Sequence, residues 1–165
     1  FELARANARE VLGLERLPDL VLAEQQARSE GLALRVSLRM CLVEIEPPSQ
    51  ALAKLRALVP EMERAGLRSG LQSAALRESQ LLARCGQHEE AVNTLRPVLS
   101  RLEHCHPLNL SVAQVWAAAV EVFSAAGLVD DAEAARQAGR GWLLDVALPH
   151  VPTEFRSGFR TRHPV

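Results

Sequence analysis

The chain has 165 residues, which is enough for one domain with a continuous apolar core. Hydrophobic residues make up 48% of it and charged residues 24%, a balance that excludes a disordered chain. The net charge is −1, with acidic and basic residues intermixed, which argues against a domain that binds nucleic acid directly.

Glycines and prolines divide the chain into about eight segments with helical apolar periodicity. Good helix formers dominate the composition, and runs of alternating Val, Ile and Thr are missing, so we predict an all-α protein. Helices are expected over 2–13, 18–30, 32–44, 49–65, 69–85, 88–103, 111–126 and 129–147.

The ends and interiors of these segments carry further signals. Ser69 is expected to cap the helix over 69–85, and Asn109 or Ser111 the helix over 111–126. Pro60 and Pro97 fall inside predicted helices, so each helix is either bent or divided into two pieces, and the continuous apolar stripe favours a bend. Residues 149–165 are expected to form an irregular tail with one short helix around 154–159.

Two stretches about 40 residues apart repeat one pattern, a glycine followed by an alanine five positions later. They are Gly86 with Ala91 and Gly127 with Ala132. In each, an apolar helix stops at the glycine and two acidic residues open the next helix, where the helix dipole favours negative charge. A fixed period of this kind indicates helical hairpins that bury their apolar faces against neighbouring copies. We therefore expect four antiparallel hairpins sharing one elongated core.

At these two units the chain resembles a tetratricopeptide repeat array. In that family a bulky residue precedes the glycine, an alanine follows it, and an aromatic residue stands early in the first helix. The resemblance implies a single domain over 1–165, wound as a right-handed superhelix and closed by a capping C-terminal tail. The period exceeds the usual 34 residues, so the helices are expected to be longer than standard ones. The matching residues are Leu82, Phe123, Gly86, Gly127, Ala91, Ala132 and Trp116.

The long period and the closing segment, residues 151–165, are similar to the helical sensor regions of large bacterial signalling ATPases and transcription regulators. This resemblance implies a non-enzymatic interaction or sensor module of a bacterial regulatory protein. Its partner would be a protein, a peptide or a small effector. Because the chain begins at Phe1 rather than Met, we expect it to be part of a longer protein.

Ligands of tetratricopeptide arrays lie in a concave groove lined by the first helix of each hairpin. When the glycine and alanine of each repeat are aligned with the family pattern, the groove positions correspond to Gln80 and Arg84 in one hairpin and to Gln114 and Glu121 in the next. Arg84 is the expected clamp for a carboxylate, because guanidinium groups bind carboxylates with two parallel hydrogen bonds. The alternative interpretation is that these four residues form an ordinary solvated face.

Aromatic residues are scarce, and three of them, Trp142, Phe155 and Phe159, lie near the end of the chain. We expect the tail to fold back so that they cap the last hairpin. The alternative is that they form a contact with another domain or a second copy. The alternative function is therefore an oligomerisation scaffold, with a homodimer as the expected assembly.

The sequence gives little support for catalysis, a metal or a cofactor. His104, Cys105 and His106 are adjacent, but adjacent side chains diverge and no second ligand pair occurs, so we expect no metal site. Cys41 and Cys85 are expected to be buried thiols, and the odd number of cysteines favours a reducing cytoplasm. No apolar run reaches the ~18 residues of a membrane helix.

Overall fold

The computed structural model describes residues 39, 46–105, 107 and 110–162. Every regular element in these residues is helical, which confirms the predicted all-α class. The helices expected over 2–13 and 18–30 lie outside the described residues, and so does the helix over 32–44 except for residue 39.

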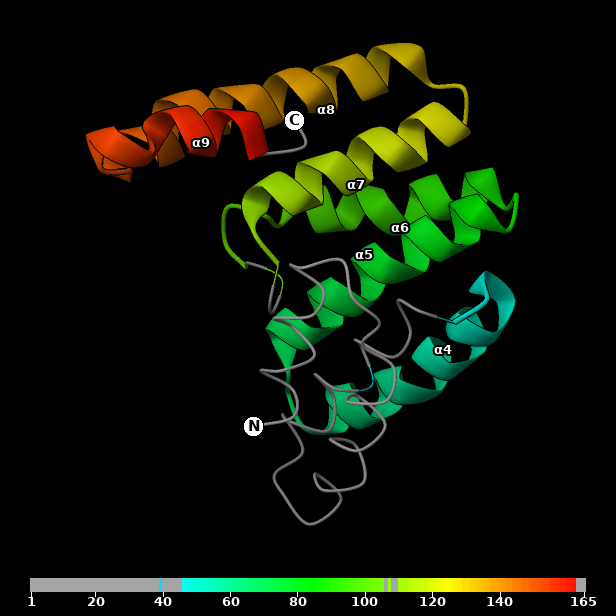
Figure 1. The fold of residues 1–165 in the computed structure, drawn as a ribbon. Helices are drawn as coiled ribbons and strands as arrows, with labels where there is room; N and C mark the ends of the chain where they lie inside the picture. The colour runs from blue at the N-terminus through cyan, green and yellow to red at the C-terminus, as the bar shows by residue number, and fades with distance from the viewer. Residues whose placement is uncertain (1–38, 40–45, 106, 108–109, 163–165) are drawn as a thin grey trace.

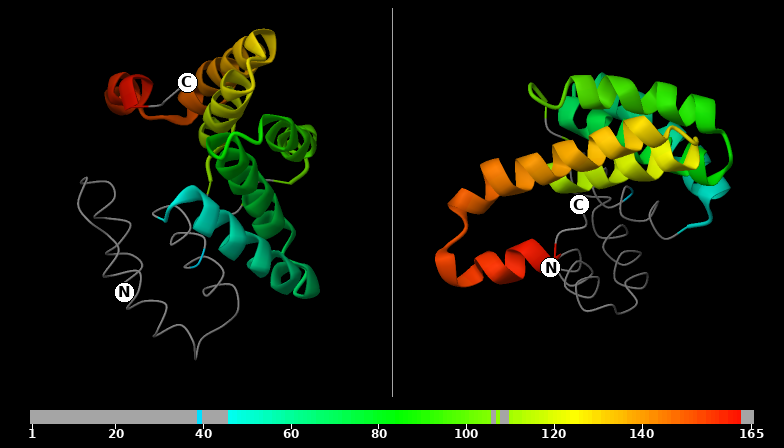
Figure 2. Two further views of the ribbon diagram at one scale, coloured as in Figure 1. Left: turned by 90° about the vertical axis from the view of Figure 1, so that its right-hand side faces the viewer. Right: turned by 90° about the horizontal axis from the view of Figure 1, so that it is seen from above.

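The helices stack in chain order from α4 to α8 (Figure 1). α4 packs against α5, α5 against α6, and α7 against α8, while α7 also contacts both α5 and α6. Figure 2 shows the α5–α6 pair between α4 and the α7–α8 pair. The bounds are Pro48–Arg64 for α4, Arg68–Arg84 for α5, His88–Ser100 for α6, Val112–Ala125 for α7 and Val129–Gly141 for α8.

Three of the connections between helices are tight turns with the same backbone geometry, and each contains a glycine with positive φ. The φ angles are 67° at Gly66, 78° at Gly86 and 72° at Gly127. In the second turn the N–H of Gln87 donates to the carbonyl of Leu82 at 2.9 Å, which is the long hydrogen bond of a Schellman motif. Because the backbone reverses within the turn, the next helix starts two residues after each glycine.

One apolar core runs through the stack from α4 to α8. α5 occupies its middle, because it contacts α4, α6 and α7. Apolar residues at helical spacing supply most of this core, but α5 also buries four polar residues, Gln72, Ser73, Ser79 and Gln80. The largest completely buried apolar side chains are Leu55, Met62, Leu76, Leu82, Leu95, Val98, Val115 and Val122.

Some local predictions are corrected by the structure. Ser69 does not cap α5, because the turn at Gly66 places Leu67 at the cap position, without a side-chain hydrogen bond. Ser111 does cap α7. α4 and α6 are each one helix that contains its proline, so the division into two pieces is wrong. Cys85 is exposed rather than buried, since it is the residue that ends α5 before the turn.

Beyond α8 the chain remains helical but changes its geometry. A π-helical segment, η1 (Trp142–Ala147), follows Gly139 and Gly141, which have weak α-helix propensity. It leads through the 3₁₀ turns η2 (Leu148–His150) and η3 (Thr153–Phe155) to α9 (Arg156–Arg162). The short tail helix is therefore present, slightly later than expected. α9 contacts η2 and η3.

Candidate functional site: the polar face of α5 and α7

Three of the four predicted groove residues meet between the first helices of two successive hairpins. The amide Nε2 of Gln80 donates to Oε2 of Glu121 at 2.6 Å. The Nε of Arg84 donates to the other oxygen, Oε1 of Glu121, at 2.9 Å. Because Gln80 and Arg84 lie on α5 and Glu121 on α7, one carboxylate joins the two helices.

Arg77 also contacts one of these three residues, although the sequence analysis did not select it. Its Nη1 donates to Oε1 of Gln80 at 3.0 Å. The spacing of three residues on one helix was the available signal, because residues three apart share a face. We call Arg77, Gln80, Arg84 and Glu121 the α5–α7 polar network.

The residues of the network differ in solvent exposure. Gln80 is buried, whereas the side chains of Arg84 and Glu121 keep 51% and 37% of their surface exposed. Their remaining hydrogen-bonding positions can therefore reach a bound group. The buried amide holds the carboxylate in place, so the exposed pair is oriented before anything binds.

Gln114 does not join this network. Its side-chain Oε1 accepts a hydrogen bond from the Ser111 N–H at 2.7 Å, and Ser111 Oγ accepts one from the Gln114 N–H at 3.2 Å. This reciprocal pair is a capping box at the start of α7. The sequence Ser-x-x-Gln is the known pattern of a capping box and could have indicated this motif. The capping box gives Gln114 a structural role.

The second helices of the hairpins are joined by a separate set of ion pairs. Arg56 on α4 donates to Glu90 on the second helix α6 at 2.7 Å and also to Glu78 on the first helix α5 at 2.6 Å. The hydrogen bond to Glu78 raises the pKa of Arg56 above its ordinary value. Arg96 on α6 donates to Asp131 on α8 at 3.0 Å. The acidic residues that open α6 and α8 thus also contact the preceding second helix.

The three tail aromatics occupy different environments. Trp142 begins η1 and is half-buried, Phe159 is half-buried on α9, and Phe155 at the end of η3 remains 64% exposed. Leu144 and Val146 on η1 are also exposed. The tail therefore presents an apolar surface of its own.

Two kinds of feature, a metal cluster and a membrane-spanning helix, are not found in the described residues. Among them, no three His, Cys, Asp or Glu side chains are placed to hold a metal ion, and His106 lies outside this part of the chain. In the same residues no helix combines the length and apolarity needed to cross a bilayer. Comparisons with protein-family models, with curated proteins and with solved structures find no match.

Proposed function

We propose that this chain is a non-enzymatic interaction module that holds a protein or peptide partner on the face formed by α5 and α7. The α5–α7 polar network carries this proposal. It joins two successive hairpins and presents a half-exposed guanidinium beside a half-exposed carboxylate. Such a pair can bind an acidic group and a basic or amide group of one extended segment.

The wider role follows from the resemblance of the repeats and the closing segment. We place the module in the sensor region of a bacterial regulatory protein, where partner binding would be passed to another domain. The stacked helices share one core, as the units of a repeat array do, which supports this proposal.

The test exchanges the two charges of the exposed pair. Peptides are first selected from a display library on the immobilised chain, and their affinities are then measured on the double variant Arg84→Glu/Glu121→Arg. The exchange keeps an ion pair between α5 and α7 but reverses the charge that the partner meets. We expect most selected peptides to lose at least about tenfold in affinity, roughly 1.4 kcal/mol.

The matched control is the exchange Arg136→Glu/Glu133→Arg in a pair that lies within α8. Peptide affinity should be unchanged in this control, and both double variants should melt within a few degrees of the parent chain. Selected peptides that bind the Arg84/Glu121 exchange as tightly as the parent chain would contradict the proposal.

An oligomerisation scaffold is a second candidate, favoured by the exposed apolar residues of the tail. Leu144, Val146 and Phe155 lie in one short stretch of chain and are all exposed. Exposed apolar groups close together are typical of contact surfaces. Under this proposal light scattering detects a dimer whose population rises with concentration, and Phe155→Ser abolishes it; a monomer at all concentrations rejects it.

A further inference from the structure

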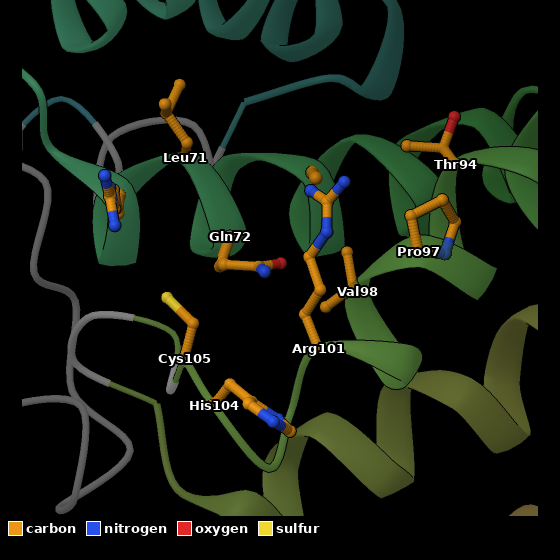
Figure 3. Close-up of a pocket in the computed structure, with 10 residues that line it drawn as sticks. Leu71, Gln72, Thr94, Pro97, Val98, Arg101, His104 and Cys105 are labelled. Carbon is orange, nitrogen blue, oxygen red and sulfur yellow. The ribbon is translucent and has the colours of Figure 1, made fainter.

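A cavity lies between the two helices of the α5–α6 hairpin, near the turn that follows α6 (Figure 3). Its volume is about 420 Å³, which is within the range of small-molecule sites. We infer that this cavity binds a small organic anion with an apolar body, such as a carboxylate on a short hydrocarbon or aromatic group.

The walls come from two matching stripes. α5 contributes four residues, and α6 with its C-cap residue contributes four more, both at the spacing i, i+3, i+4 and i+7 of one helix face. The turn after α6 closes one end with His104 and Cys105. The stripes are Arg68, Leu71, Gln72 and Ala75 on α5, and Thr94, Pro97 and Val98 on α6 with Arg101 at its C-cap.

Gln72 is the observation that points to a ligand. The residue as a whole is 7% exposed, yet no described residue forms a hydrogen bond with its side chain. Figure 3 shows its amide directed into the space bounded by Arg101, His104 and Cys105. The amide atoms are not sealed from solvent, so they reach the space of the cavity. A ligand oxygen there can accept a hydrogen bond from the Gln72 amide in place of water.

The charge of the lining selects an anion. Arg68 and Arg101 line the cavity, and neither forms an ion pair or a side-chain hydrogen bond with any described residue. By contrast, Arg56, Arg84 and Arg96 are all paired with carboxylates. None of the ten lining residues is acidic, and His104 adds a third group that can carry positive charge. A carboxylate or phosphate group would meet guanidinium donors that have no competing partner.

The apolar part of the lining selects an organic anion over an inorganic one. Leu71, Ala75, Pro97 and Val98 line the cavity, and most of its surface is apolar. Hydrocarbon placed against them is removed from water, which favours binding in proportion to the area covered. The site therefore combines an apolar wall with a few converging polar groups, as small-molecule sites usually do.

This site is independent of the proposed partner surface. On α5 the cavity stripe and the residues of the α5–α7 polar network lie on opposite sides, because a helix turns about 100° per residue. One of the two proposals can therefore fail while the other stands.

The test follows the Gln72 side-chain amide by NMR while the full 165-residue chain is titrated with phenylacetate, octanoate and phenyl phosphate. We expect saturable shifts of this amide with the organic anions. Phenylacetamide, which is neutral, and inorganic phosphate, which has no apolar body, should each bind at least about tenfold more weakly. Comparing phenylacetate with phenyl phosphate tells which anionic group the site prefers.

Three variants complete the experiment. The double variant Arg68→Ala/Arg101→Ala removes two exposed, unpaired side chains, so it should fold normally and lose binding. Gln72→Leu should weaken binding of the organic anions, since it removes a hydrogen-bond donor of the cavity. Arg140→Ala on α8 is the control and should bind like the parent chain.

Two results would overturn the inference. One is the absence of any saturable Gln72 shift with all three organic anions at millimolar concentration. The other is binding that is equal in the parent chain and in the Arg68→Ala/Arg101→Ala variant. Inorganic phosphate binding as tightly as phenyl phosphate would refute the role of the apolar wall.

Discussion

At the scale of single residues, the turns depend on glycines that no other residue replaces without strain. Gly86 has a φ of 78°, in the left-handed region where a Cβ atom approaches the backbone. A Cβ built at this position meets nothing within 4 Å, so any cost of a side chain there comes from the backbone alone. Gly70 offers the opposite case, because it lies inside α5 with ordinary helical geometry.

We predict that Gly86→Ala lowers the free energy of unfolding by about 1–2 kcal/mol, the usual cost of a left-handed non-glycine residue. Gly70→Ala is the matched control. Its new Cβ would lie 3.5 Å from Leu67 Cβ and 3.6 Å from Met62 Sδ, which are ordinary contacts. It should therefore raise stability by about 0.5–1 kcal/mol through helix propensity. Urea unfolding measures both, and equal effects of the same sign would refute the explanation.

At the scale of elements, the second helices are linked by a repeated ion pair. Arg56 and Arg96 are the ninth residues of α4 and α6, and Glu90 and Asp131 are the third residues of α6 and α8. Each arginine donates to the acidic residue on the next second helix. The same register on successive helices places the pairs one above the other along the stack, so the repeat pattern extends to the surface charges.

We predict a favourable coupling of about 0.5 kcal/mol between Arg56 and Glu90 in a double-mutant cycle to alanine, because both side chains are about half exposed. In 1 M NaCl the Debye length falls to about 3 Å, so most of this coupling should disappear. Chemical unfolding of the four chains at low and high salt measures it. A coupling that is zero at low salt would show that the pair is incidental.

At the scale of the whole molecule, the core is continuous but each hairpin contacts only its neighbours. α5 contacts α4, α6 and α7, whereas η1 contacts α7, α8 and the adjacent turn η2. In a stack of this kind, stability is the sum of each unit and its interfaces. The middle of the stack should therefore affect more of the molecule than its end.

We predict that Leu82→Ala, at a completely buried position of α5, costs about 2–5 kcal/mol. Amide hydrogen exchange should show reduced protection in α4, α6 and α7 together. Leu143→Ala, at a buried position of η1, should reduce protection mainly in α8 and η1. If Leu143→Ala lowered protection equally from α4 to α8, the molecule would unfold as one unit and the stacked-unit description would be wrong.

How far each feature was predictable depends on the range of the forces behind it. The glycine turns, the buried stripes and the start of α7 at Ser111 follow from neighbours a few residues apart, so the printed sequence was sufficient for them. The repeat register also selected Gln80, Arg84 and Glu121, which the fold brings together. Gln114 was misjudged because its local capping partner competes for the same side chain.

By itself, the sequence determined that the described part of the chain is helical, where these helices turn and which apolar residues they mostly bury, because backbone propensity and apolar periodicity act locally. Only the tertiary structure decided which polar groups found partners on another helix. Glu121 receives two donors from α5, while Gln72, on the opposite side of the same helix, faces a cavity without one. That difference depends on the angle and spacing at which separate helices pack, and a single helix does not encode it.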